Sequence, residues 1–185
     1  MLEEILGAAL DLDETALRRF RRYYELLTEW NKVMNLTAIE GEENTARLHF
    51  LDCAALTQMV DLRGKRVIDV GTGAGFPGLV LKILCPEMEL TLLDSLDKRV
   101  RFLSTVCDEL GFSEVRCLHA RAEEAPPELR EAEKGIRLLG GETERVAEYP
   151  VPGTEVRHNA VLIRKIAPTP EKYPRKWSLM KKQPL

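Results

Sequence analysis

The stretch Val67–Gly78, VIDVGTGAGFPG, decides the fold of this chain. It has the pattern of a short apolar strand, a glycine-rich turn and the start of a helix. A second apolar run, Leu90–Leu93, follows and ends at Asp94. Parallel strands joined through a helix bring their carboxyl ends to one edge of a sheet, so the bare backbone of the turn and the Asp94 carboxylate should lie together. This pattern predicts a nucleotide site.

The glycines allow two registers for that nucleotide. Gly73-x-Gly75-x-x-Gly78 matches the dinucleotide fingerprint, whereas Asp69-x-Gly71-x-Gly73-x-Gly75 puts an acid inside the strand end. The second register is favoured, because the apolar strand runs directly into Gly71. An acid two residues before the turn suits a ligand with a cationic amino-acid end and no pyrophosphate, namely S-adenosylmethionine. Asp69 can equally be a buried acid that caps the N–H groups of the turn.

Two other residues of this region also have a plain structural interpretation. Phe76 can line the ligand or be an ordinary core aromatic. Asp94 can accept hydrogen bonds from both ribose hydroxyls or cap the next helix, for which Ser95 and Asp97 are further candidates.

The spacing of apolar residues predicts an α/β protein with a Rossmann-like sheet and an N-terminal helical extension. Residues 1–63 have a helical pattern, with a connection expected over 31–39. Strands then alternate with helices, which is typical of right-handed βαβ units and a parallel sheet buried on both faces. Later, two strands without an intervening helix should pair antiparallel. The expected strands are 67–70, 89–93, 115–118, 142–149 and 159–165, and the expected helices of this part are 79–85, about 97–110 and 128–139.

The expected organisation is therefore a helical subdomain over 1–63, a Rossmann-like domain over 64–167 and a basic tail over 168–185. Composition agrees with a soluble globular protein, since 44% of the 185 residues are hydrophobic and 31% are charged. The cysteine pattern described below favours a cytoplasmic one. No apolar run approaches the roughly 20 residues of a membrane span.

The metal-binding residue types show no constellation, so no metal site is expected. The cysteines lack C-x-x-C spacing and lie in apolar patterns, which favours reduced core thiols over disulfides or metal ligands. The residues concerned are Cys53, Cys85, Cys107 and Cys117, with His49, His119 and His158 scattered among them.

Basic residues gather in two places although the formal net charge is −3. Seven lie between Arg164 and the end of the chain, and Arg18, Arg19, Arg21 and Arg22 form a second cluster. Either group can bind phosphate. Alternatively, the arginine cluster can be a solvated helix face paired with Glu14 and Glu25, and the tail a solubilising end.

Several motifs closely resemble the RsmG (GidB) family, bacterial methyltransferases of small-subunit ribosomal RNA. The resemblance runs over residues 1 to about 130 and again from about 131 to 185. The glycine motif is shared with many methyltransferases, whereas the first motif and the tail are far more specific. The motifs are Asn31–Thr37 (NKVMNLT), His49–Asp52 (HFLD), Asp69–Gly78, Leu92–Ser95, Lys98-Arg99, Arg121–Glu123 and Ala167–Arg175.

The resemblance implies a class I methyltransferase sheet and S-adenosylmethionine-dependent methylation at N7 of a guanine in the 530 loop of 16S rRNA, with the small ribosomal subunit as partner. By similarity, Gly71 and Phe76 line the cofactor together with Gly73 of the same turn. Asp94 holds the ribose, and Ala122-Glu123 meet the adenine. Guanine N7 already has a free lone pair, so no general base is required and no catalytic residue is assigned.

The chain also departs from that family. A sheet of this type normally has seven strands, and only about five are expected here. Strands 4 and 5 and the helix between them are missing after about residue 125, which is about 50 residues. The strand at 67–70 should then have an exposed apolar edge, which can also pair between chains. Weakened or absent methyltransferase activity is expected, with a non-catalytic remnant that binds S-adenosylmethionine or RNA as the alternative. A nicotinamide-dependent oxidoreductase is disfavoured.

Overall fold

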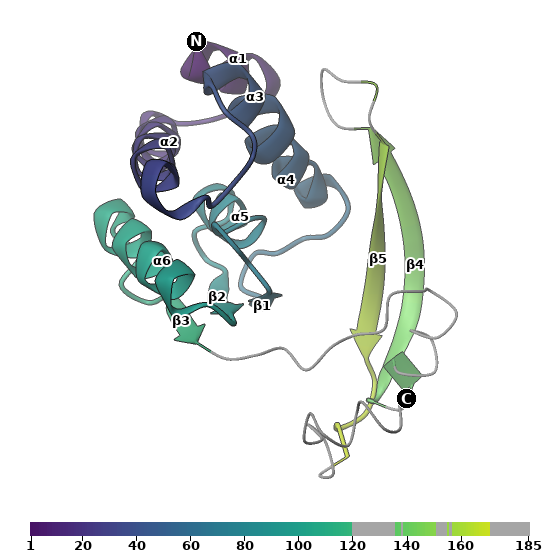
Figure 1. Cartoon of the computed structure of the whole chain (residues 1–185). Coiled ribbons are helices and arrows are strands. Elements are labelled where there is room, and N and C mark those ends of the chain that lie inside the picture. Colours follow the sequence, from purple (N-terminus) through teal and green to yellow (C-terminus); the bar gives the residue numbers. More distant parts are fainter. Residues whose placement is uncertain (120–135, 138, 151–154, 156, 171–185) are drawn as a thin grey trace. The chain divides into compact units, whose positions relative to one another are not determined.

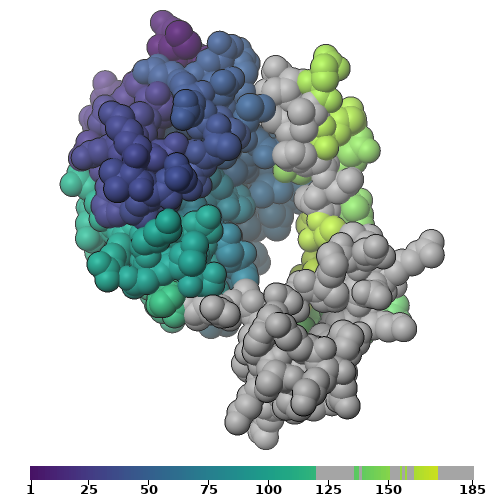
Figure 2. Space-filling model, in the orientation of Figure 1, coloured from purple at the N-terminus to yellow at the C-terminus, as the bar shows by residue number. Residues whose placement is uncertain are grey.

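The fold was described from a computed structural model, shown in Figure 1. The structure describes residues 1–119, 136–137, 139–150, 155 and 157–170. The chain divides into two compact units, Met1–Arg121 with Pro150–Val156, and Ala122–Tyr149 with Arg157–Leu185. In the first unit the N-terminal helices lie directly against the strand–helix part, as the adjoining purple, blue and teal surfaces in Figure 2 show.

The first unit begins with helices. Asp13 caps the longest of them, because its side chain accepts a 2.7 Å hydrogen bond from Ala16 N. That helix ends where Asn35 adopts the left-handed conformation (φ 49°), so the connection expected from residue 31 starts later than predicted. The helical elements are α1 (Leu2–Ala9), α2 (Glu14–Met34), α3 (Glu42–Thr45), a π-helical turn η1 (Ala46–Leu51), α4 (Asp52–Ala55) and a 3₁₀ turn η2 (Leu56–Gln58).

A parallel three-stranded sheet follows, in the order β1-β2-β3. Val67 of β1 pairs with Leu90 of β2, and Leu92 of β2 pairs with Cys117 of β3. Helix α5 connects the first two strands and α6 the next two, which confirms the α/β class and the three expected parallel strands. The elements are β1 (Arg66–Val70), α5 (Gly78–Leu84), β2 (Glu89–Asp94), α6 (Asp97–Leu110) and β3 (Arg116–His119).

The expected cap of α6 is wrong. Its N-cap is Leu96, without a side-chain cap bond, and neither Ser95 nor Asp97 caps it. Instead, the Asp94 carboxylate reaches forward and accepts from Leu96 N at 2.9 Å. The predicted end of this helix at about residue 110 is confirmed, because Gly111 follows it in the left-handed conformation at φ 74°.

The expectation that β1 is buried on both faces is also wrong. Ile68 and Val70, which share one face, are 56% and 52% exposed, and Leu118 of β3 is 43% exposed. Among the described strands, β1 pairs only with β2 and therefore lies at a sheet edge. The predicted unpaired edge of β1 is confirmed among the described strands. The lost burial has another cause: both crossovers run in the same direction along the sheet, so right-handed connections place α5 and α6 on one face and leave the face of Ile68, Val70 and Leu118 uncovered by either helix.

The second unit contains a two-stranded sheet of β4 (Gly141–Pro150) and β5 (Arg157–Lys165). Arg157 contacts Glu148 and Arg164 contacts Glu142, so numbers rise along one strand as they fall along the other. The antiparallel pairing is thereby confirmed, although β4 and β5 form a sheet of their own. Of the helix expected over 128–139, residues 128–135 and 138 lie outside the described part.

One hydrophobic core joins the N-terminal helices to α5, α6 and β2. Phe20 and Tyr23 of α2, Phe50 of η1 and Phe102 of α6 are fully buried in it. A charged residue also lies inside: Lys82 of α5 is 2% exposed. Its ammonium donates to the carbonyls of Pro86 (2.6 Å) and Met88 (2.7 Å) and pairs with Glu114 at 2.8 Å.

Replacement of Lys82 by methionine is expected to destabilise the fold by about 2–3 kcal/mol, because the part-buried carbonyl of Pro86 and the buried carbonyl of Met88 lose their donor. Urea unfolding of the variant and the parent measures the difference. Lys65→Met, at an exposed position, is the control and should change stability by less than about 0.5 kcal/mol. Equal stability of Lys82→Met and the parent would show that the hydrogen bonds of the ammonium do not stabilise the fold.

Candidate functional site

The glycine-rich turn lies between β1 and α5, where the sequence places it. Gly71, Gly73 and Gly75 all have positive φ, at 74°, 61° and 99°. Such angles favour glycine over residues with a side chain. The N–H groups of Gly71 and Thr72 donate to Leu93 O at 2.8 and 3.2 Å, so the turn is tied to β2.

The glycines of this turn fall into two kinds. An added Cβ would meet nothing within 4 Å at Gly71, and only Gly71 O at 4.0 Å at Gly73. At Gly75 it would come 2.4 Å from Leu79 Cδ1, and at Gly78 it would come 2.6 Å from a Leu92 methyl. Gly71 and Gly73 therefore leave room for a ligand, whereas Gly75 and Gly78 are needed for packing.

This difference discriminates between the two registers. In the dinucleotide register the middle glycine, Gly75, is the one whose backbone a pyrophosphate approaches. Gly75 is buried beneath Leu79 and Tyr23, whose hydroxyl would lie 2.7 Å from an added Cβ. The open glycines are Gly71 and Gly73, which supports the register that begins at Asp69.

Asp69 braces the turn from the end of β1. Its Oδ2 accepts from Thr72 Oγ1 at 2.6 Å and from Gly78 N at 2.9 Å. Burial raises the pKa of Asp69, and these two hydrogen bonds oppose the rise. The structural interpretation of Asp69 as a buried acid that caps the turn is confirmed, and a contact with a ligand stays a prediction.

Asp94 lies at the end of β2 beside the turn, as the sequence predicts. Its Oδ2 accepts from Gly73 N and its Oδ1 from Leu96 N, both at 2.9 Å. Arg99 Nη1 lies 3.5 Å from Oδ2, and the residue is 2% exposed. The carboxylate thus connects the strand, the glycine turn and the start of α6.

Phe76 belongs to an aromatic cluster that supports the turn from the helical side. His49 stacks on it with ring centroids 4.2 Å apart and a 6° interplanar angle, and Tyr23 stacks at 5.4 Å. The Tyr23 hydroxyl donates to Ala74 O at 2.5 Å. Phe76 is a core aromatic in this respect, and its contact with a cofactor stays a prediction.

His49 and Tyr23 are site residues that the sequence analysis missed. The signal for Tyr23 was present, because it follows Phe20 by three positions on the same helix face. His49 Nε2 lies 2.8 Å from Thr37 Oγ1, and burial lowers the pKa of the imidazole. A neutral ring therefore joins the Asn31–Thr37 motif to Phe76.

The other predicted contacts divide into those outside the described residues and those already paired. Ala122 and Glu123 lie outside, as does the tail from residue 171. The arginine cluster is described and engaged: Arg18 with Glu14, Arg19 with Leu110 O, Arg21 with Glu3 and Glu42, and Arg22 with Glu25 and Glu109. The paired-face interpretation is confirmed, and the Arg21 partnership lowers the pKa of Glu3 to about 2.

Within the described residues, neither the cysteines nor the usual metal-ligand residue types form a further candidate site. The four cysteines are free thiols, with Cys53 and Cys107 buried. Across the described part of the chain, no group of three His, Cys, Asp or Glu is placed to hold a metal ion. No helix found there has both the length and the apolar character to cross a bilayer.

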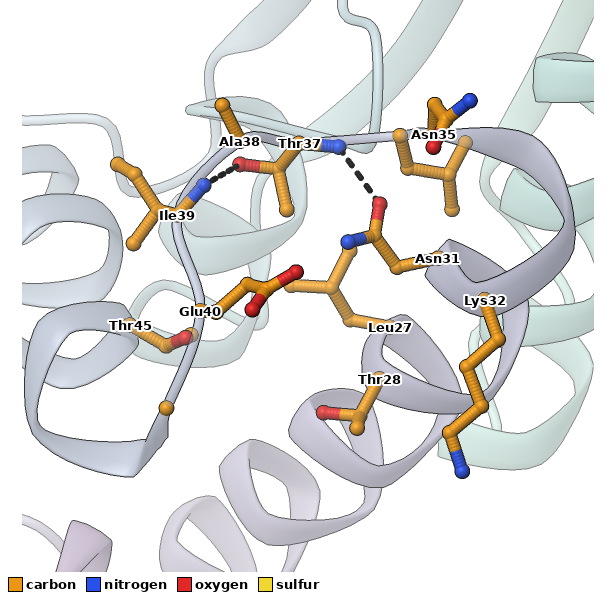
Figure 3. Close-up of a pocket in the computed structure, with 12 residues that line it drawn as sticks. Leu27, Thr28, Asn31, Lys32, Asn35, Thr37, Ala38, Ile39, Glu40 and Thr45 are labelled. Carbon is orange, nitrogen blue, oxygen red and sulfur yellow. Dashed lines mark hydrogen bonds between the residues drawn. The ribbon is translucent and has the colours of Figure 1, made fainter.

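A cavity of about 780 Å³ lies beside the Asn31–Thr37 motif. Its walls are the C-terminal half of α2, the loop Asn35–Gly41 and Thr45 of α3 (Figure 3). Asn31 Oδ1 accepts from Thr37 N at 2.9 Å, and this bond fixes the carboxamide at the edge of the cavity.

A family model and the curated relatives indicate the same family. The family model described as rRNA small subunit methyltransferase G (GidB) matches residues 16–137. A protein of that name from Acetivibrio thermocellus is 33% identical over 230 residues, covering 100% of this chain and 95% of the relative. Another from Clostridium botulinum (strain 657 / Type Ba4) is 34% identical over 223 residues, 95% of this chain and 93% of the relative. A crystal structure of a SAM-dependent methyltransferase from Aquifex aeolicus matches 44% of each chain, with 26% identity and a TM-score of 0.36.

The alignment with the Acetivibrio protein also bears on the missing segment. It spans 230 residues although this chain has 185, so at least 45 residues of the relative have no counterpart here. That difference agrees in size with the expected absence of about 50 residues. Its place after about residue 125 stays a prediction. The matched residues include the Asn31–Thr37 motif, the glycine turn and Asp94, and on this evidence the chain belongs to the rRNA small subunit methyltransferase G family.

Proposed function

We propose that this chain binds S-adenosylmethionine and transfers its methyl group to N7 of a guanine in the 530 loop of 16S rRNA, within the small ribosomal subunit in the cytoplasm. Family membership supports methylation of small-subunit rRNA as the reaction. The observation that carries the cofactor assignment is the pair of open glycines, Gly71 and Gly73, beside the Asp94 carboxylate.

The residues present fit this cofactor. The backbone at Gly71 and Gly73 is open to a ligand that carries no pyrophosphate. Each carboxylate oxygen of Asp94 has capacity for a second hydrogen bond, since a carboxylate offers about four lone-pair sites. Asp94 is 2% exposed, so the turn must open before ribose hydroxyls can reach it. Ala122 and Glu123 would complete the adenine side by similarity.

The main contribution required of the protein in methyl transfer is the correct placement of the two reacting groups. The bound cofactor supplies an electrophilic methyl sulfonium, and guanine N7 supplies a lone pair in the ring plane. The chain must hold N7 in line with the methyl group and exclude water. It must also tolerate the positive charge on the product ring, which the half-buried carboxylate of Asp69 and the buried carboxylate of Asp94 near the turn favour.

A second candidate function is a non-catalytic remnant that still binds S-adenosylmethionine or RNA. At least 45 residues of the Acetivibrio relative are absent here, and Ile68 and Val70 of β1 are exposed. Strands 4 and 5 would cover that edge and form the wall nearest the target base. The cofactor contacts rest on β1, β2 and the glycine turn, so binding can survive where turnover is weakened.

Two measurements test the proposal. Calorimetric titration should show binding of S-adenosylmethionine and no binding of NAD. Transfer of labelled methyl to unmodified small ribosomal subunits, followed by mapping of the modified base, should show slow modification at guanine N7 in the 530 loop. Turnover equal to that of a full-length relative would contradict the expected impairment, and cofactor binding without any transfer would establish the remnant.

A further inference from the structure

The cavity beside the Asn31–Thr37 motif contains a buried polar group that lacks a partner. Thr45 is 2% exposed, and within the described residues its hydroxyl makes no hydrogen bond. A buried hydroxyl is normally paired, because leaving it unpaired is unfavourable. Its side chain lines the cavity, so a ligand there would satisfy it (Figure 3).

Other polar groups converge on the same space. Glu40, whose backbone carbonyl accepts from Asn44 Nδ2, extends its carboxylate from the loop toward Asn31 of α2, as Figure 3 shows, and among the residues described that carboxylate has no partner. Because Asn31 Oδ1 is held by Thr37 N, the amide nitrogen Nδ2 is left to donate. Leu27 and Ile39 give the cavity aliphatic surface. Its volume of about 780 Å³ lies in the usual range of ligand pockets.

This set of groups matches the edge of a nucleobase. A carboxylate accepts from an exocyclic amino group, and a carboxamide nitrogen donates to a ring nitrogen or carbonyl. Proteins read single-stranded RNA in this way, through hydrogen bonds to the edges of splayed-out bases. We propose that the cavity binds one nucleotide of the RNA substrate, and that its base carries an exocyclic amino group. This inference rests on the proposed function for the identity of the RNA.

A chain of contacts connects the cavity to the glycine turn. Thr37, on the cavity wall, contacts His49 at 2.8 Å, and His49 stacks on Phe76 at 4.2 Å. Phe76 lies two residues before the start of α5, in the turn that also holds Gly71 and Gly73. A nucleotide bound beside Thr37 is therefore fixed relative to the place where the cofactor is expected, and it would position the neighbouring target base.

Cytidine and uridine monophosphate are the matched probes, because they differ only along one edge of the ring. Cytosine has an amino donor and a bare ring nitrogen there, which suit the Glu40 carboxylate and the Asn31 amide nitrogen, whereas uracil has an oxo group and a ring N–H in the reverse order. Titrated into the full chain by calorimetry, cytidine monophosphate should bind roughly tenfold more tightly, since its amino group donates to a carboxylate whereas the uracil oxygen meets it unfavourably. Equal affinities would overturn the proposal.

Two variants locate the binding. Glu40→Gln should reduce the preference for cytidine monophosphate to within about twofold, because glutamine can also donate to the uracil oxygen. Thr45→Val should weaken binding of cytidine monophosphate about fivefold or more while leaving stability equal or higher, because an unpaired buried hydroxyl is removed. Thr105→Val, in α6, is the control and should change neither affinity. Unchanged binding in Thr45→Val, or the same loss in Thr105→Val, would contradict the assignment.

An RNA oligonucleotide tests whether the cavity binds a nucleotide within RNA or only a free nucleotide. An eight-residue oligocytidine should bind more tightly than oligouridine, and Glu40→Gln should remove that preference. If only the free monophosphate binds selectively, the cavity is not an RNA subsite and the proposal fails. Methyl transfer is assayed separately, so selective RNA binding without transfer would reject the proposed function alone, and transfer without selectivity would reject this inference alone.

Discussion

Replacement of Gly75 by alanine is expected to destabilise the chain by about 3–5 kcal/mol, a large part of the stability of an ordinary domain. An added Cβ would lie 2.4 Å from Leu79 Cδ1 and 2.7 Å from the Tyr23 hydroxyl, at a φ of 99°. Strain from the positive φ and overpacking of the buried turn both contribute. Urea unfolding measures the loss.

Gly71→Ala is the matched comparison, because the same methyl group enters open space there. Its φ of 74° imposes strain of about 1 kcal/mol, without steric overlap. The fold should survive, and affinity for S-adenosylmethionine should fall about tenfold or more, because the methyl group occupies the ligand's place. Equal unfolding free energies of the two variants would contradict the division of the glycines into packing and binding positions.

The difference between the open and the packed glycines also shows how much of the site can be predicted from the sequence. The strand–turn–helix pattern placed the turn correctly, and Asp94 followed from the rule that parallel strands end at one edge. The choice between registers rested on where the apolar strand stops, and the open space at Gly71 and Gly73 supports it. Which glycines face open space could not be predicted, since that depends on Tyr23 of α2, which is far away in sequence.

The sequence-based predictions were wrong where the surrounding structure outweighed the local preferences of the residues. Ser95 and Asp97 are good capping residues by type, but the helix begins at Asp97, so the cap position falls on Leu96 between them, and the Asp94 carboxylate accepts from Leu96 N. The apolar run of β1 predicted burial on both faces, yet Ile68 and Val70 are exposed because the right-handed crossovers place α5 and α6 on the opposite face of the sheet. The arginine cluster could be interpreted in two ways until its carboxylate partners on α1, α3 and α6 were seen.

Asp94→Asn is expected to damage both the fold and the cofactor site. In the native protein both carboxylate oxygens accept from backbone N–H groups, Oδ2 from Gly73 and Oδ1 from Leu96. Asparagine has one acceptor and one donor, so either orientation of its amide points an NH₂ group at a backbone N–H. The turn should therefore loosen, with a stability loss of about 2 kcal/mol in the absence of any ligand.

The same substitution should weaken S-adenosylmethionine binding about 100-fold, because two charge-assisted hydrogen bonds to ribose hydroxyls are lost. Calorimetry measures the affinity, and urea unfolding without ligand measures the stability separately. Asp97→Asn, three residues further on at an exposed position paired with Arg101, is the control and should leave both nearly unchanged. A stability loss with unchanged affinity would make Asp94 purely a brace of the turn. An affinity loss with unchanged stability would mean that the hydrogen bonds from Gly73 N and Leu96 N to Asp94 contribute little to the stability of the fold. Contact with the ligand would then be the reason for an acid at the end of β2.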